Sequence, residues 1–400
     1  MLSYLYRVCA LIILFGLAGP SASGQQATSQ PAHAHDHPHA EVRPSRSLQF
    51  PDFPDGRALL VVDLHTHSVF SDGHVWPTVR VWESSRDQLD AMAVTEHLEY
   101  QPHRDDIPHP DRNRSFELAE LAAANAGESA PLVIPGVEIT RQLPPGHVNA
   151  VFVQDANPIL TIERRADDNL ANARLALEEA QRQGAFTFWN HPAWGHDAPA
   201  GIMQVPAEQQ ALVSEGLIQG IEVANGGEFS EEALQFALDN DLAILGTSDI
   251  HGLIDYDYDI IAGEHRTASL VIASERSLQG IRDGLEARQT VALFKNQFIG
   301  REDVMQTVLG AVLSLEVADY QRNSTVLRVN VRNDGPLPVV LQNVGPRNFA
   351  NAASVVTIPA HGSLRISITD TPDPAAVYIQ ARVLNAYTAP RENPVIVLRP

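Results

Sequence analysis

Histidines and carboxylates recur in short segments that follow apolar, β-branched runs of the sequence. The first run, Val-Val-Asp-Leu at 61–64, leads into His65-Thr66-His67, where two histidines stand two residues apart. Side chains two apart on a strand point to the same side, so both imidazoles could reach one cation. Further candidates follow in the next loop or beside later strands: Ser71-Asp72-Gly73, Thr95-Glu96-His97, Gly136-Val137-Glu138, Gly146-His147, Asn190-His191-Pro192 and Ser248-Asp249-Ile250-His251.

Imidazole nitrogens and carboxylate oxygens are typical ligands of divalent transition metals. A single histidine at a strand end is more often a hydrogen-bonded structural residue, and an isolated His-X-His pair decides little. A set of this size is different, because packing so many ionisable groups without a cation would cost several kcal/mol each. The set therefore predicts a metal centre.

The elements that must position these residues follow a βα pattern between about residues 58 and 301. Apolar runs predict strands at 59–64, 91–95, 132–139, 148–153, 185–189, 220–224, 243–246 and 268–273. Stretches of helical period predict helices at 78–89, 114–125, 166–182, 207–215, 230–240 and 278–287. This alternation is typical of an α/β domain with parallel strands. If these strands form a barrel, their carboxyl ends share one mouth, where residues distant in sequence converge.

The pattern changes after about Asp303. Short, partly alternating runs at 325–331, 339–344, 363–368 and 376–383 are separated by turns such as Asn333-Asp334-Gly335-Pro336. We therefore expect a small β-sandwich over residues 303–400, with a structural or interfacial role. The preceding catalytic domain would cover residues 55–302.

Composition limits the classes of function. The chain has 400 residues, of which 44% are hydrophobic, enough to bury a large catalytic core and a smaller second domain. Its formal net charge of -21, from 49 acidic and 28 basic residues, argues against a nucleic-acid partner. A small anionic substrate would need local cations, which bound metal ions would provide.

The first 24 residues have the pattern of a signal peptide: Arg7, then an apolar run at 8–17, then small and polar residues. The apolar run is roughly half of the ~20 residues that a membrane span needs, so stable membrane insertion is the less favoured interpretation. This predicts a periplasmic or secreted protein. The one cysteine, Cys9, lies inside the run, so the mature chain would have neither disulfides nor thiolate metal ligands.

Residues 25–54 are rich in Pro, Ser, Gln and Ala and are expected to form a flexible leader. Four histidines alternate with other residues within it, at His33, His35, His37 and His39. The leader could be a loose metal-collecting tail, or a solvated linker that is His-rich by chance. Neither alternative makes it the active site, because a disordered tail cannot fix a coordination geometry.

The motifs DLHTHS, SDG, TEH, GVEIT, GH, NHP and SDIH, in this order, resemble those of the PHP (polymerase and histidinol phosphatase) superfamily. The resemblance covers roughly residues 61–301 and implies a distorted (β/α)7 PHP barrel, with about seven parallel strands and two or three divalent metal ions (Zn, Mn or Fe). By this resemblance, the first metal site would consist of His65, His67, Glu138 and Asp249. Glu138 would bridge to a second site completed by His191 and His147.

The resemblance also implies a third metal site, formed by Asp72, His97 and His251. Some family members have a histidine where this chain offers Asp72, and His74 stands close by as a competitor. Three features look most like secreted PHP phosphodiesterases of the Sb-PDE type: the expected secretion, the continuation of the sequence after His97 and the trailing β-domain. This narrower resemblance implies hydrolysis of small organic phosphate diesters.

The mechanism that this implies uses a metal-bound hydroxide to attack phosphorus, with a third metal or a protonated histidine stabilising the leaving group. The candidate catalytic residues are Asp249, His251 and Arg141, the last of which would hold a nonreacting phosphate oxygen. Other basic residues could take that role, or be ion-pair partners: Arg104, His265 and Arg266. Three aromatic residues beside the motifs could line a substrate pocket or pack in the core: Trp189, Trp194 and Tyr256.

Two other functions agree with the same residues. A metal-dependent hydrolase of carbamate or carboxyl esters would keep the metal site and cleave a different bond. A noncatalytic metal-binding protein of the periplasm would use the His-rich leader. The sequence gives no indication of the oligomeric state.

Overall fold

The computed structural model describes residues 48–140, 146–161, 168–195 and 198–400. The expected signal peptide, the four leader histidines and Arg141 lie outside these ranges. Within the ranges, no helix is both long enough and apolar enough to cross a membrane. The core already includes Leu48, Phe50 and Phe53, which are buried, so packed structure begins inside the segment expected to be a flexible leader.

The expected α/β domain contains one large sheet of twelve strands, in the order β18-β11-β10-β9-β1-β2-β3-β4-β5-β6-β7, with β8 also paired to β6. All eight expected strands are present: β1 (Ala58–Asp63), β2 (Ala91–Val94), β3 (Leu132–Thr140), β4 (His147–Val151), β5 (Phe186–Trp189), β6 (Gly220–Asn225), β8 (Ala243–Thr247) and β9 (Ala268–Ala273). Strands absent from the sequence prediction are β7 (Glu228–Phe229), β10 (Thr290–Phe294) and β11 (Gln297–Gly300).

The sheet is mixed, which corrects the expectation of parallel strands. Strands β1, β2 and β3 are parallel, as are β5, β6 and β8. In contrast, β4 is antiparallel to both β3 and β5, and β9 is antiparallel to β1. Only six residues separate β3 from β4, too few for the crossover that a parallel connection requires. The sheet is a curled half-barrel, and the regular (β/α)7 repeat is not confirmed.

Side-chain hydroxyls join β8 to the strands across the curl. The amide of Gly246 donates to Ser269 Oγ at 3.0 Å, and this hydroxyl donates back to the Gly246 carbonyl at 2.8 Å. Likewise, the amide of Ile244 donates to Thr290 Oγ1 at 3.1 Å. A Cβ at Gly246 would stand 2.7 Å from the Ala268 carbonyl oxygen, so this close approach requires glycine. The hydroxyls thus take the place of a backbone ladder.

Beyond the strand ends, two motif segments pair with each other directly. The amide of Asp249 donates to the His65 carbonyl at 2.9 Å, and the amide of His67 donates to the Ile250 carbonyl at 3.1 Å. Thr66 and Ile250 form a parallel bridge. The His-X-His segment after β1 and the Asp-Ile-His segment after β8 are therefore held together, although about 180 residues separate them in sequence.

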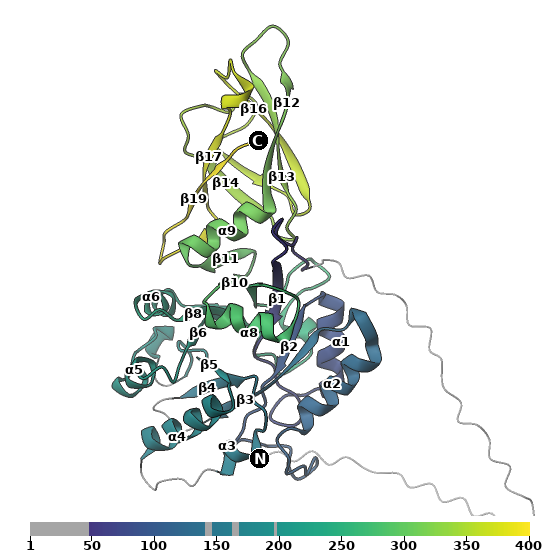
Figure 1. The fold of residues 1–400 in the computed structure, drawn as a ribbon, viewed down its shortest axis with the longest axis vertical. Coiled ribbons are helices and arrows are strands. Elements are labelled where there is room, and N and C mark those ends of the chain that lie inside the picture. Colours follow the sequence, from purple (N-terminus) through teal and green to yellow (C-terminus); the bar gives the residue numbers. More distant parts are fainter. Residues whose placement is uncertain (1–47, 141–145, 162–167, 196–197) are drawn as a thin grey trace, which may run out of the picture. The chain divides into compact units, whose positions relative to one another are not determined.

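The six expected helices are present: α1 (Pro77–Asp87), α2 (Arg114–Ala126), α4 (Asn169–Arg182), α5 (Ala207–Ser214), α6 (Glu231–Asp239) and α8 (Leu278–Glu286). Two shorter helices are α3 (Asn157–Thr161) and α7 (Ile254–Asp257), and three 3-10 turns cover Gly127–Ser129, Pro199–Gly201 and Pro374–Ala376. The expected start of α6 is confirmed, because the Ser230 side chain accepts a hydrogen bond from the Ala233 amide. Figure 1 shows α1 and α2 side by side next to the first strands of the sheet.

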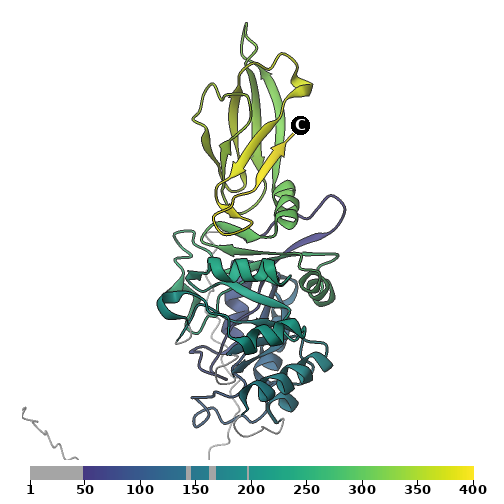
Figure 2. The same ribbon diagram turned by 90° about the vertical axis from the view of Figure 1, so that its left-hand side faces the viewer.

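The C-terminal part is the expected β-sandwich. One sheet has three strands, β12 (Leu313–Tyr320), β13 (Leu327–Asn333) and β16 (Gly362–Ile368). The other has four, β14 (Val339–Asn343), β15 (Val355–Ile358), β17 (Ile379–Val383) and β19 (Val395–Leu398). The strands, green to yellow in Figure 2, run roughly along a common direction.

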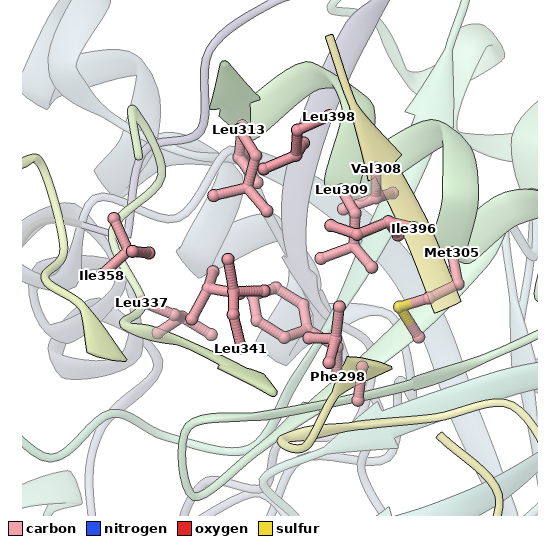
Figure 3. Close-up of a cluster of buried hydrophobic side chains, with 14 of the residues drawn as sticks. Phe298, Met305, Val308, Leu309, Leu313, Leu337, Leu341, Ile358, Ile396 and Leu398 are labelled. Atoms are coloured by element: carbon pink, nitrogen blue, oxygen red, sulfur yellow. The ribbon is translucent and has the colours of Figure 1, made fainter. Parts of the chain in front are cut away.

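A helix that the sequence analysis did not anticipate, α9 (Glu302–Val312), precedes the sandwich. Its buried face packs against Phe298 of β11 and against apolar residues of the sandwich, as Figure 3 shows for Met305, Val308 and Leu309. The short strand β18 (Ala386–Tyr387) also pairs with β11. One continuous hydrophobic cluster therefore joins the sandwich to the large sheet. Burial of each large apolar side chain in it stabilises the fold by about 1.5 to 3 kcal/mol.

Candidate metal centre

All nine residues expected to bind metal lie in one cluster at the strand ends: His65, His67, Asp72, His97, Glu138, His147, His191, Asp249 and His251. They come from segments after β1, β2, β5 and β8 and from β3 and the start of β4. The register of β3 and β4 explains one part of this convergence, because Glu138 and His147 lie near each other on adjacent strands. Four of the nine residues are buried, His65, His67, His97 and Glu138, and the other five are partly exposed.

The innermost part of the cluster contains the two histidines of the His-X-His pair. Their Nε2 atoms are 3.0 Å apart. Both nitrogens face Oδ1 of Asp249, at 3.2 Å from His65 and 3.1 Å from His67. They also face Oε2 of Glu138, at 3.5 and 3.4 Å. Two imidazole nitrogens and two carboxylate oxygens thus converge on one point, as the first expected site requires.

Glu138 connects this point to the remaining histidines. Its Oε1 lies 2.8 Å from Nδ1 of His147 and 3.5 Å from Nε2 of His191. Its Oε2 lies 2.7 Å from Nδ1 of His97. Every expected site therefore contains Glu138 or a residue in contact with it, which agrees with the bridging role expected of this carboxylate.

Asp72 organises the outer part of the cluster. Its Oδ2 lies 3.3 Å from Nε2 of His97, and its Oδ1 lies 3.1 Å from Nε2 of His251. His67 is also close, with its Nδ1 3.8 Å from Asp72 Oδ1. His97 thus faces Asp72 with one ring nitrogen and Glu138 with the other, so it stands between two of the expected sites rather than in one.

Three carboxylate oxygens in the cluster have the environment expected of cation ligands. Oδ1 of Asp72, Oε2 of Glu138 and Oδ1 of Asp249 are buried, and each lacks a hydrogen bond of good geometry. An unsatisfied buried carboxylate oxygen is costly, and cation coordination removes the cost. Each oxygen belongs to a different group of ligand atoms that lie within 4.8 Å of one another. The donor set, made of nitrogen and oxygen only, therefore fits divalent cations.

The electrostatics of the cluster keep protons on some imidazoles when no cation is bound. Burial lowers the pKa of His65, but the carboxylates of Asp249, Glu222 and Glu138 outweigh burial and raise this pKa well above its ordinary value. For His97 burial is likewise outweighed, by carboxylates that include Glu138, and its pKa rises to about 10.

Burial decides the pKa of His67, whereas the imidazoles decide the pKa values of the two acids Glu138 and Asp249. Burial lowers the pKa of His67 to about 4, in spite of the nearby carboxylates. Burial raises the pKa of Glu138 and Asp249, but the imidazoles around them outweigh it, so both pKa values lie below their ordinary range. The acids are therefore ionised at neutral pH and available as ligands. A bound cation would replace the protons on the imidazoles.

Glu222 is a functional residue that the sequence analysis missed. It is buried in β6, and its Oε1 lies 2.7 Å from Nδ1 of His65. The same carboxylate accepts hydrogen bonds from the backbone amide of His191 at 2.6 Å, from Asn225 Nδ2 at 2.9 Å and from Thr247 Oγ1 at 2.7 Å. Such partners fix the ring orientation of a metal ligand and raise its basicity. The signal in the sequence was a single acidic residue inside an apolar strand.

Two of the candidate ligands have backbones in the left-handed region, with φ of 27° at His191 and 49° at Asp249. Such conformations are unfavourable for residues other than glycine and persist where surrounding contacts enforce them. The hydrogen bond to Glu222 holds the backbone of His191, and the hydrogen bond to the His65 carbonyl holds that of Asp249. The fold thus maintains strain where the side chains must converge.

Arg80 contacts the backbone of the segments that carry several candidate ligands. Its buried guanidinium donates to the carbonyls of His67 at 2.8 Å and of His251 at 2.8 Å, and to the Ile250 carbonyl at 3.2 Å. It also pairs with Glu83 at 2.7 Å. Arg80 therefore links the segments after β1 and β8 through their backbones, and its role is to position the ligands that they carry.

Two of the basic residues considered for phosphate binding are not available for it. Arg266 is fully buried and pairs with Asp87 at 2.6 Å and with Asp63 at 3.2 Å. His265 is also buried, with Nδ1 2.7 Å from the Arg266 carbonyl and Nε2 accepting from the Asn296 amide at 3.0 Å. The segment before β9 was expected to offer a substrate contact, but Arg266 neutralises buried acids and His265 bonds to backbone groups instead.

Other candidates are also not among the grouped ligand atoms. The Arg104 side chain is 77% exposed and 3.9 Å from Asp105. His74 is exposed, so the structure favours Asp72 over this competitor. Trp189 is buried against Phe236. Trp189 is therefore a core residue, and Arg141 remains a prediction outside the described part of the chain.

The cluster opens into a cavity of about 630 Å³. Candidate ligands form its inner wall: Asp72, His97, His147, His191, Asp249 and His251. Its outer wall includes Trp194, Asn225, Glu228, Tyr256 and Asp257. Trp194 and Tyr256, considered as pocket residues from the sequence, thus lie at the opening, with exposed fractions of 61% and 78%. No lysine or arginine of the described chain lines this cavity.

Comparison with known proteins places the chain in a family. Residues 313–399 match the family model of an Ig-like domain. None of the curated proteins matches the chain. A solved structure of PsfC from Pseudomonas syringae is 20% identical over 59% of this chain and 91% of its own length, but its TM-score of 0.40 is too low to carry an argument.

A second solved structure is more informative. It is a two-domain protein of Bacteroides vulgatus, described as containing a predicted PHP-like metal-dependent phosphoesterase. The match covers 88% of this chain and 98% of that chain, with a TM-score of 0.77. Since the two sequences are 39% identical across both domains, this chain belongs to the PHP-like metal-dependent phosphoesterases.

Proposed function

We propose that the protein is a phosphodiesterase that hydrolyses small organic phosphate diesters. The observation that carries the proposal is the set of three unsatisfied carboxylate oxygens, on Asp72, Glu138 and Asp249, each within its own group of imidazole nitrogens beside one cavity. Two or three divalent cations held there would supply positive charge to the nonbridging phosphoryl oxygens and lower the pKa of water.

The candidate ligands would have different roles around the phosphate group. Asp249 and Glu138 hold negative charge next to the His-X-His pair and thereby fix where cations can reside. His251 has the most exposed candidate ligand side chain, 34%, and its Nδ1 lies 2.8 Å from the backbone carbonyl of Asp249. This contact places the proton of the neutral ring on Nδ1 and directs Nε2 toward Asp72.

His251 could also hold the proton that a leaving alkoxide needs. Burial lowers the pKa of His251, but Asp72 and Asp249 outweigh burial and raise it. When no cation occupies the group around Asp72, His251 would therefore hold a proton at Nε2 more strongly than a free imidazole does, at an atom close to the cavity. General acid catalysis of this kind typically contributes ~10²- to 10⁴-fold.

The absence of lysine and arginine from the described cavity lining supports diesters over monoesters. A phosphate monoester carries up to two charges near neutral pH and needs more cationic contacts than a diester, which carries one. The same observation agrees with a carbamate or carboxyl ester substrate, which we keep as the second candidate. It does not favour the noncatalytic metal-binding alternative.

Substrate tests can separate these functions. The protein, loaded with Zn²⁺ or Mn²⁺, is offered bis(4-nitrophenyl) phosphate, 4-nitrophenyl phosphate and 4-nitrophenyl acetate. We expect the diester to give the highest kcat/KM, and Asp249→Asn to reduce it by at least about 100-fold. Asp239→Asn, at an exposed position on α6, is the matched control and should keep full activity.

Two outcomes would contradict the proposal. Hydrolysis of the acetate alone would assign the site to carboxyl esters. Failure of the metal-loaded protein to cleave any of the three esters would remove the hydrolase function altogether.

We also propose that the chain is exported, on the basis of Arg7 and the apolar run at 8–17. Expression of the full chain in a bacterium, followed by cell fractionation and N-terminal sequencing, tests this. Export predicts a mature N-terminus near residue 24 in the periplasmic or secreted fraction. An intact N-terminus in the cytoplasm would contradict it.

A further inference from the structure

The cavity beside the metal centre has two chemically different halves. Its inner wall consists of the candidate ligands, and its outer wall brings together Trp194, Tyr256, Glu228 and Asp257. We propose that the outer half binds a positively charged ammonium group on one of the substrate's two ester groups, so that the preferred substrate is a zwitterionic phosphodiester. This inference rests on the proposed function and names its substrate class.

The two acids of the outer half are available to a ligand. Glu228 and Asp257 are both exposed and line the cavity. Neither forms an ion pair with a described residue, whereas many other surface carboxylates of this chain do, such as Glu231 with Arg391 at 3.1 Å. Exposed carboxylates alone are usually just solvated. Here the two acids line one cavity together with two large aromatic side chains, and this combination favours a binding role over simple solvation.

Lys295 contacts this wall from outside the cavity, and its ammonium group already has partners. Lys295 donates from Nζ to the Gly227 carbonyl at 2.9 Å, and its ammonium lies 4.9 Å from the ring centre of Phe294. Gly227 lies on the cavity wall, but Lys295 does not line the cavity. Its ammonium therefore bonds to the backbone of the wall and does not enter the space beside Glu228.

The aromatic residues supply the second feature that an ammonium group needs. Trp194 packs against the inner ligands, with ring centres 5.2 Å from His191 and 6.1 Å from His147, yet it keeps 61% of its surface exposed. Tyr256 is 78% exposed on α7, which also borders the cavity. Exposed aromatic faces beside carboxylates attract ammonium groups through cation–π and Coulomb interactions.

Trp194 and Glu228 are also close to each other, because both line a second, small cavity next to the first. An ammonium group lying over the Trp194 ring would therefore also be near the Glu228 carboxylate. Asp257 directly follows Tyr256 in sequence and lines the same main cavity. The outer half thus has one acid and one aromatic residue on each of two segments of the chain.

The charges of the two halves fit a zwitterion. Up to three divalent cations would carry about six positive charges against the three inner carboxylates of Asp72, Glu138 and Asp249, so the inner half would attract the phosphate anion. The outer half carries two further carboxylates and no described cation. The chain's formal charge of -21 also disfavours the approach of anions, and a zwitterion with no net charge avoids this repulsion.

A matched pair of substrates tests the inference. 4-Nitrophenyl phosphocholine and 4-nitrophenyl 3,3-dimethylbutyl phosphate have the same leaving group and nearly the same shape, but only the first has a quaternary nitrogen. We expect the metal-loaded full chain to have about tenfold higher kcat/KM for the choline ester. The preference should decrease as salt is raised, because exposed carboxylates are screened.

Variants locate the preference on the outer wall. The double substitution Glu228→Gln and Asp257→Asn should reduce the preference to about twofold or less, while kcat/KM for the dimethylbutyl ester stays within about twofold of the original. Glu208→Gln, at a partly exposed position on α5 outside the cavity lining, should leave the preference unchanged. Calorimetry with choline alone should detect binding to the original protein and not to the double variant.

The outcomes separate the two proposals. Equal kcat/KM values for the matched pair, with bis(4-nitrophenyl) phosphate still cleaved, would overturn the ammonium subsite and leave the phosphodiesterase proposal intact. If no phosphate diester is cleaved, the proposed function fails, and choline binding decides the subsite separately. Choline binding that persists in the double variant would overturn the subsite in either case.

Discussion

Oε1 of Glu222 lies 2.7 Å from Nδ1 of His65, and both side chains are fully buried. This contact holds the proton of the neutral imidazole on Nδ1 and turns Nε2 toward Asp249 and Glu138. Carboxylates in this position on other metal-binding histidines orient the ring and raise its basicity. Glu222 also holds the strained backbone of His191, so one carboxylate positions two candidate ligands.

Substituting Glu222→Gln should therefore weaken metal binding before it affects folding. We expect about a tenfold loss of affinity for Zn²⁺ or Mn²⁺, with activity largely restored at saturating metal. Metal titration monitored by calorimetry measures the affinity, and Glu208→Gln is the control. Unchanged metal affinity together with reduced activity would contradict a positioning role.

Metal binding should release protons at neutral pH. The pKa of His65 lies well above its ordinary value and that of His97 is about 10, so both rings are protonated at pH 7 in the metal-free protein. Ligands must lose these protons to bind a cation, so roughly two protons should leave and metal affinity should rise between pH 6 and 8. Calorimetry in buffers with different ionisation enthalpies counts the protons; zero release would contradict the prediction.

The same shifts predict how pH affects the metal-free protein. A histidine whose pKa is raised on folding stabilises the fold fully below its unfolded pKa of about 6.5. This contribution is lost as the pH rises through the folded pKa, which is about 10 for His97. In the presence of a chelator, the free energy of unfolding should therefore fall between about pH 7 and 10. Denaturant unfolding at several pH values measures the fall, which His97→Gln should reduce.

The core shared by α9 and its neighbours should be essential to stability. Leu309 of α9 is fully buried in the cluster that joins the sandwich to the large sheet. Leu309→Ala should lower the free energy of unfolding by about 2 to 5 kcal/mol. Leu121→Ala on α2, where the side chain is 58% exposed, should cost no more than about 0.5 kcal/mol. Equal costs in denaturant unfolding would show that the shared core contributes little.

The contact between β8 and β9 should not tolerate a side chain at Gly246. A Cβ there would stand 2.7 Å from the Ala268 carbonyl oxygen, so Gly246→Ala should destabilise the protein by about 1 to 3 kcal/mol. In α9, a Cβ at Gly310 would meet no atom within 4 Å, and Gly310→Ala should be neutral or stabilising by up to about 1 kcal/mol. Thermal unfolding of both variants checks the contrast, and a stable Gly246→Ala protein would contradict it.

The amino-acid sequence alone was enough to locate the local elements. Apolar runs marked eight of the strands of the α/β domain, and stretches of helical period marked six of its helices, α6 among them. The spacing of His65 and His67 and the order of the later motifs predicted one cluster, and the structure does bring those residues together. These features depend on chain periodicity and neighbouring residues, which the sequence displays directly.

The tertiary structure decided what depends on distant partners. The direction of β9 follows from its pairing with β1 across the sheet, and short local runs do not encode it. The burial of Arg266 depends on Asp63 and Asp87, which stand 203 and 179 residues away. The same holds for Glu222, whose position 157 residues from His65 hid its contact with that ring. A sequence shows which groups can ionise, but only folding determines which charges meet, because that depends on contacts between segments far apart along the chain.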